Sequence, residues 1–124
     1  MKTLTLTREE RIETLFLKAE EIFQKSLVLT QRGIAHGHAN FAAHVKTFRA
    51  EVKPLDAIYS GKEDHTKSVA EIDIDFDPFE WTDPEKTESE YRKQLIETDR
   101  YISYLNYLIE LDKPFLLKAI GGAA

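Results

Sequence analysis

The chain has 124 residues, of which 42% are hydrophobic and 31% charged, so its composition is that of an ordinary globular protein and not of a disordered segment. It contains no cysteine, which excludes a disulfide framework, a zinc–thiolate site and a thiol nucleophile. The net charge of −5 is uneven, because residues 1–53 carry nine Lys/Arg against six Asp/Glu whereas residues 54–124 carry eight against sixteen. We expect one domain over residues 1–124.

The chain shows no signal for export or for a membrane span. Its first seven residues lead into Arg8 and two glutamates before an apolar region forms, which is unlike a secretory signal. The stretch 101–120 leans apolar, but charged residues and Pro114 interrupt it. We expect a cytoplasmic protein without membrane contact.

A first long helix is predicted from Arg8 to about Gln31. Thr7 and Glu10 have the spacing of a capping box, and Gly33 follows the last periodic residue. Apolar residues recur at steps of three and four and predict one broad buried stripe, formed by Ile12, Leu15, Phe16, Ala19, Ile22, Phe23 and Leu27.

A second helix is predicted to begin near His38 or Asn40. Its apolar residues alternate between steps of four and three, which is coiled-coil spacing: Phe41, Val45, Phe48, Val52 and Leu55. Pro54 falls inside this pattern and removes an intrahelical hydrogen bond, so the helix is expected to kink or restart there.

The period changes to two over residues 69–76. Ile72, Ile74 and Phe76 alternate with acidic residues, which predicts a half-buried strand with one apolar and one acidic face. The stretch 2–7, where leucines alternate with threonines, is its expected partner.

A third long helix is predicted from Thr87 to about Leu111. Thr87 and Glu90 repeat the capping-box spacing, and Pro114 can open a short C-terminal helix over residues 115–120. The predicted fold class is therefore mainly α. It is an antiparallel bundle of three long helices, the second kinked at Pro54, with a short β element near residues 69–76.

Three histidines, His36, His38 and His44, are the candidate metal ligands, because neutral imidazole is a common ligand. The last two are six positions apart, however, which places them on different sides of a helix, so capping, surface or core roles are favoured. Phosphate-binding loops and nucleophile elbows are absent. We expect no cofactor and no enzymatic activity. A metal-dependent enzyme at these histidines is a further alternative.

Basic residues of the second predicted helix suggest another function. Lys46, Arg49 and Lys53 are three or four residues apart and would share one helix face. With Arg32 nearby they could contact phosphate groups, so a nucleic-acid-associated protein is the alternative interpretation.

The segment 71–81 is the most unusual, because it combines acidic and aromatic residues. A calcium loop is excluded since Pro78 stands where that loop needs glycine. The aromatic residues could close the core, and the carboxylates could imitate a nucleic-acid backbone. The functional interpretation we favour is partner binding, with aromatic anchors and a charged rim: Phe76, Asp77, Phe79, Glu80 and Trp81. The expected function is non-enzymatic protein–protein interaction in a regulatory or assembly protein, and the coiled-coil spacing favours a homodimer.

Overall fold

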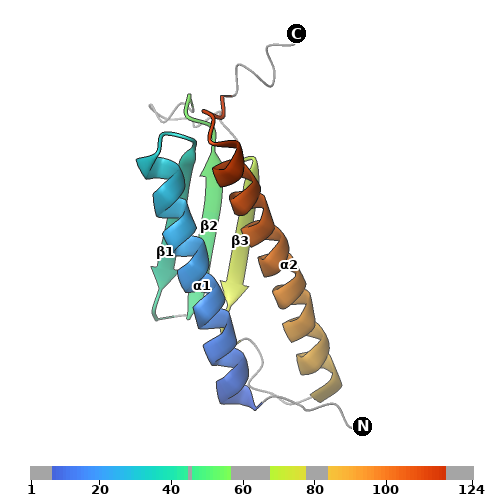
Figure 1. The fold of residues 1–124 in the computed structure, drawn as a ribbon. Coiled ribbons are helices and arrows are strands. Elements are labelled where there is room, and N and C mark those ends of the chain that lie inside the picture. The colour runs from blue at the N-terminus through green and yellow to red at the C-terminus, as the bar shows by residue number, and fades with distance from the viewer. Residues whose placement is uncertain (1–6, 45, 57–67, 78–83, 117–124) are drawn as a thin grey trace.

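The structure is a computed structural model that describes residues 7–44, 46–56, 68–77 and 84–116. The element order is α1 (Arg8–Gln31), β1 (His36–Ala42), β2 (Thr47–Lys53), β3 (Ala70–Asp75) and α2 (Pro84–Leu111). The strands form one antiparallel sheet in the order β1-β2-β3, and both helices lie on one face of it (Figure 1). The fold is therefore mixed α/β, and the predicted three-helix bundle is wrong.

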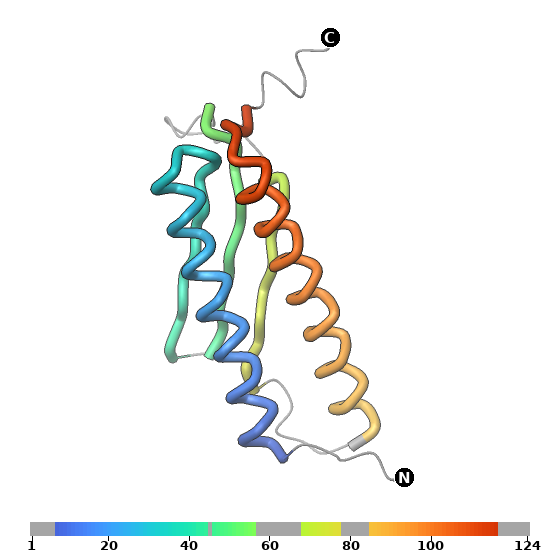
Figure 2. The backbone as a smooth tube through the Cα atoms, in the orientation of Figure 1, coloured from blue at the N-terminus to red at the C-terminus, as the bar shows by residue number. Residues whose placement is uncertain are grey.

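The two helices start at the same end of the sheet and run in the same direction (Figure 2). Three antiparallel strands separate them along the chain, and each new element reverses the direction of the one before it. The fifth element therefore runs parallel to the first. The predicted antiparallel arrangement of long helices is wrong for the same reason.

Strands β1 and β2 replace the predicted second helix. They are joined by a tight turn in which the Lys46 amide donates to the Ala43 carbonyl at 3.2 Å, and Lys46 has a φ of 55°. The register places Phe41 opposite Phe48. Within β2, apolar residues alternate with polar ones, so Phe48, Ala50 and Val52 are buried under the helices. Pro54 follows the end of β2 and does not kink a helix.

The predicted limits of the first helix are confirmed. Thr7 accepts a hydrogen bond from the Glu10 amide, and the Glu10 carboxylate accepts one from the Thr7 amide, which completes the capping box. At the other end Gly33 has a φ of 69°, and the Ile34 amide donates to the Leu29 carbonyl at 2.9 Å. This is the Schellman termination that a glycine after the last turn favours.

The predicted strand near residues 69–76 is also confirmed as β3, with Ile72 and Ile74 buried. It pairs with β2, while most of the stretch proposed as its partner lies outside the described residues. Helix α2 ends at Leu111 as predicted but begins at Pro84, so Thr87 is inside the helix and is not its cap. Proline suits a first helical turn, where its missing N–H costs nothing. Residues 114–116 are not helical, and the rest of the predicted C-terminal helix falls outside the described ranges.

The hydrophobic core lies between the two helices and the inner face of the sheet. Its largest fully buried aliphatic side chains come from α1, the segment after it, β2, β3 and α2: Leu15, Ile22, Leu29, Ile34, Val52, Ile74 and Leu105. Backbone bonds close one end, because the Phe115 amide donates to the Ile34 carbonyl and the Leu55 amide donates to the Phe115 carbonyl. No helix within the described ranges is apolar over enough of its length to cross a membrane.

Helix α1 lies very close to β1 at Gly37. A Cβ atom at this position would lie 2.7 Å from the Ser26 carbonyl oxygen and 2.8 Å from its Cα. The Gly37 amide also donates to the Thr30 hydroxyl at 3.0 Å. From this contact α1 crosses the sheet obliquely, away from the far end of β1 (Figure 1). The contact therefore fixes one end of the α1–β1 pair and leaves the other end open.

Replacing Gly37 with alanine should destabilise the protein by about 1 to 3 kcal/mol, because the added methyl group overlaps backbone atoms that have little freedom to move. Urea unfolding monitored by circular dichroism measures this loss. The control is Asn40→Ala in the same strand, whose side chain is exposed and whose loss should change stability by less than about 0.5 kcal/mol. Equal stability of Gly37→Ala and wild type would contradict the close approach.

Candidate functional site

An open apolar groove lies between α1 and β1. Its volume is about 300 Å³, and five phenylalanines line it together with two alanines, Glu20 and Asn40: Phe16, Phe23, Phe41, Phe48 and Phe76. We call it the phenylalanine groove. Phe48 and Phe76 are buried and form its floor, whereas Phe16, Phe23 and Phe41 are 39%, 47% and 47% exposed. Partly exposed aromatic side chains gathered around one groove are typical of a binding surface.

The aromatic rings of the groove contact one another across three elements. The rings of Phe16 and Phe76 are stacked, with centroids 4.0 Å apart and planes 5° from parallel. Phe41 meets both of them edge-on, at 5.9 Å from Phe16 and 5.8 Å from Phe76. Such pairs hold each ring in a defined orientation. The groove is therefore a built surface and not a group of independent side chains.

Helix α1 carries two apolar stripes where the sequence predicted one broad buried stripe. Leu15, Ala19 and Ile22 are buried against the sheet and α2, as expected. A second stripe follows the helix edge next to β1, is largely exposed, and consists of three apolar residues and one glutamate: Phe16, Glu20, Phe23 and Leu27. We call it the outer stripe. The prediction that Phe16, Phe23 and Leu27 are core residues is wrong, because β1 is the last strand on this side of the sheet as far as the structure describes it and leaves them exposed.

The backbone of β1 borders the same groove. In an antiparallel strand the N–H and C=O of one residue point to the same side, and successive residues alternate. The Gly37 amide bonds to Thr30 in α1, so Gly37, Ala39 and Phe41 direct their backbone groups away from β2. β1 is an edge strand of the described sheet. Ala39 and Phe41 can therefore offer hydrogen bonds to an added strand.

The opposite edge, β3, differs in chemistry and in how its backbone is bonded. The side-chain amide of Gln94 in α2 accepts from the Asp75 amide at 2.9 Å and donates to the Asp75 carbonyl at 3.0 Å.

A second groove lies beside this edge, with a volume of about 500 Å³, and is lined by charged and tyrosine side chains: Glu71, Asp73, Glu97, Arg100, Tyr101 and Tyr104. Burial raises the pKa of both tyrosines above the ordinary value.

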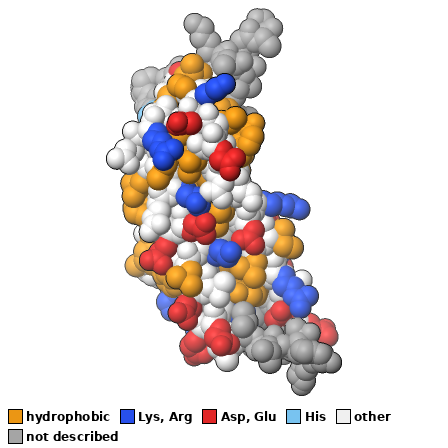
Figure 3. Space-filling view, viewed as in Figure 1, with side chains coloured by type: hydrophobic (Ala, Val, Ile, Leu, Met, Phe, Trp, Pro, Cys, Tyr) orange, Lys and Arg blue, Asp and Glu red, His pale blue; other side chains and the backbone are white. Residues whose placement is uncertain are grey.

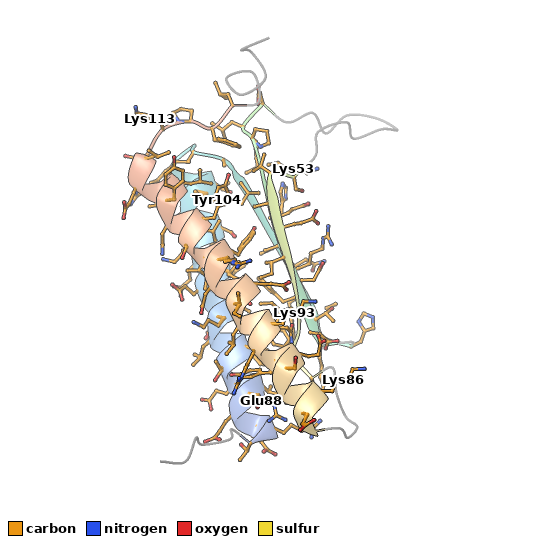
Figure 4. All side chains as sticks on the ribbon, turned by 90° about the vertical axis from the view of Figure 1, so that its right-hand side faces the viewer. Lys53, Lys86, Glu88, Lys93, Tyr104 and Lys113 are labelled. Carbon is orange, nitrogen blue, oxygen red and sulfur yellow. The ribbon has the colours of Figure 1, made fainter. Side chains whose placement is uncertain are left out.

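The acidic face of β3 is partly neutralised within the sheet. Arg49 in β2 bonds to Glu71 at 2.7 Å and to Asp73 at 3.3 Å. The negative charges of these two carboxylates raise the pKa of the guanidinium above its ordinary value, and Asp73 has the larger effect. The sheet face opposite the helices bears polar side chains that project away from them (Figure 4). The cross-strand pairing leaves fewer carboxylates available to attract a basic partner than the sequence suggested.

The structure places two of the five predicted partner-binding residues, while Phe79, Glu80 and Trp81 lie outside the described residues. Phe76 is only 2% exposed and contributes the floor of the phenylalanine groove. Asp77 forms a two-pronged ion pair with Arg8, whose Nε lies 3.0 Å from the carboxylate. The hydrogen bonds from Arg8 hold the pKa of Asp77 below its usual value. Partner binding by these residues stays a prediction.

The four basic residues of the nucleic-acid interpretation do not share a helix face. Lys46 is in the β1–β2 turn, Arg49 is paired with β3 carboxylates, and Lys53 is buried at the end of β2 (Figure 4). Arg32 caps the end of α1. On the helical face of the molecule, acidic and basic side chains are interspersed (Figure 3). Binding of nucleic acid stays a prediction, but the basic helix face on which it was based is not formed.

The three histidines divide between the two ends of β1. The rings of His36 and His38 lie on the same face of the strand, with centroids 6.3 Å apart, and His36 Nε2 is 3.2 Å from the Leu55 carbonyl. His44 follows the other end of β1, at least about 20 Å along an extended strand from His36. Across the described parts of the chain no three potential ligands gather to hold a metal ion.

Asp77→Asn should lower the free energy of unfolding by about 1 to 2 kcal/mol at pH 7, because it weakens charged hydrogen bonds to Arg8. The native pKa of Asp77 is below its value in the unfolded chain, so the pair stabilises the fold above about pH 4 and this contribution is lost as the pH falls through the native pKa. Urea unfolding at pH 7 and near pH 2 should show the two proteins converging in acid.

The control for this prediction is Asp99→Asn, which removes an exposed pair with Lys18 and should cost less than about 0.5 kcal/mol. A difference between Asp77→Asn and wild type that is the same at both pH values would contradict the role of the carboxylate.

Comparison of the chain with models of protein families, with curated proteins and with solved structures finds no match in any of the three.

Proposed function

We propose that this protein is a non-enzymatic protein-interaction module that binds an apolar segment of a polypeptide in the phenylalanine groove. The observation that carries this proposal is the exposure of Phe16, Phe23 and Phe41 around one groove. Phenylalanine is enriched in protein interfaces, where a few large side chains supply most of the binding energy. The function predicted from the sequence is retained, but its site moves from residues 71–81 to the α1–β1 edge.

The shape and chemistry of the groove favour a polypeptide over a small molecule. Sites for small molecules usually enclose most of the ligand surface and place several polar groups around it. This groove is open, and its described lining includes one ionisable side chain, Glu20. A pair of groups for acid–base catalysis would need a second one. The adjacent backbone of Ala39 and Phe41 adds hydrogen-bonding groups that suit a peptide chain.

The proposal is tested by capture on beads from a lysate of the organism that encodes the protein, with the bound proteins quantified by mass spectrometry. Phe23→Asp and Phe41→Asp each place a charge in the groove and should reduce specific capture at least about tenfold. The matched control is Leu17→Asp, which is also exposed on α1 but lies outside the groove, and it should capture as wild type does.

Circular dichroism of every variant shows that the fold is retained. If folded Phe23→Asp and Phe41→Asp capture the same proteins as wild type, in the same amounts, the phenylalanine groove is not the binding surface.

A further inference from the structure

We propose that the occupant of the phenylalanine groove is a second copy of this chain, with β1 of one copy pairing antiparallel with β1 of the other and the two α1 helices side by side. This inference rests on the proposed function and names its partner. It depends on three features of the α1–β1 edge: the charge of β1, the spacing of the outer stripe, and the way these two elements are aligned.

The charge of the two sheet edges favours self-pairing at β1 and opposes it at β3. β1, with the sequence HGHANFA, contains no Asp, Glu, Lys, Arg or Pro. β3, with the sequence AEIDID, carries three carboxylates. Like charges directly opposite each other destabilise paired strands, and charged or proline residues on an edge normally prevent self-association. β1 lacks these protections, whereas β3 has them.

The positions of the outer stripe are symmetrically spaced, and three of its four residues are apolar. Its spacing of four, three and four residues reads the same in both directions, so an antiparallel copy places Phe16 opposite Leu27 and Glu20 opposite Phe23. An interface with two-fold symmetry requires this property, because the same patch must fit itself. The centre of the stripe lies between Glu20 and Phe23.

One two-fold axis fits both elements. Gly37 lies against Ser26 and Phe41 against Phe16, so the middle of β1, Ala39, lies beside the middle of the outer stripe. An axis through Ala39 pairs this residue with Ala39 of the second copy, where its outward N–H and C=O groups can bond. The same axis places Phe41 opposite Gly37 of the second copy, which has no side chain to oppose the ring and whose amide keeps its bond to Thr30, so the strand bonds centre on Ala39.

The mass in solution tests the proposal directly. Sedimentation equilibrium over a concentration series should give twice the chain mass of 14.3 kDa for wild type and for the control Leu17→Asp. Phe23→Asp should raise the dimer dissociation constant at least about tenfold while its circular dichroism stays unchanged. A wild type that is monomeric up to millimolar concentration overturns the proposal, and so does a folded Phe23→Asp that dimerises as wild type does.

The axis has its own test, because the chain contains no cysteine. Ala39→Cys should form a disulfide-linked dimer on mild oxidation, since paired strands place opposite Cα atoms about 5.5 Å apart, within disulfide reach. Glu71→Cys on β3 is the matched control and should stay monomeric on denaturing gels. A cross-link in Glu71→Cys, with none in Ala39→Cys, overturns the assignment of the interface to β1.

The outcomes separate this inference from the proposed function. A monomeric wild type that captures another protein, with capture lost in Phe23→Asp, overturns self-association and leaves the groove as a site for a different partner. Failure of both capture and dimerisation removes the proposed function as well.

Discussion

The close approach of α1 to β1 at Gly37 is the constraint on which the arrangement of this protein depends. Only a residue without a Cβ lets the Ser26 backbone lie this near the strand. The helix is thereby fixed over one end of β1 and crosses obliquely toward the other strands (Figure 1). The divergence leaves the space that Phe16, Phe41 and Phe76 partly fill. A packing contact at one end is thus accompanied by an open apolar groove at the other.

The sequence predicted α1 and β3 well because each carries a pattern that is compatible with only one type of secondary structure. Thr7, Glu10 and Gly33 mark both ends of the helix, and the acidic–apolar alternation marks β3. The β1–β2 hairpin was not predicted, and the reason is physical. Its turn places Lys46 in the left-handed region of backbone conformation, where glycine or asparagine is usual. Because a lysine stands there, the sequence carries no recognisable turn signal between the two strands. The coiled-coil spacing therefore favoured a helix, although polar and apolar residues alternate strictly over residues 47–53 as in a strand.

The candidate site was harder to predict than the fold. Phe16 and Phe23 belong to a continuous apolar pattern, and a sequence does not show that a three-stranded sheet is too narrow to cover all of it. The spacing of the outer stripe was the available signal. Phe76 was among the predicted partner-binding residues, and its aromatic ring lies beneath Phe16 and is buried. Asp77 is occupied by Arg8, a pairing across 69 residues that local spacing cannot reveal.

The amide of Gln94 has a consequence for how far this sheet can grow. By bonding both backbone groups of Asp75, it occupies a place that an incoming strand would need. A sheet with two unprotected edges can pair at both and extend into a fibre, whereas a sheet with one such edge stops once that edge is paired. Along the described part of β3, Gln94 and the carboxylates therefore oppose the addition of a further strand at this edge.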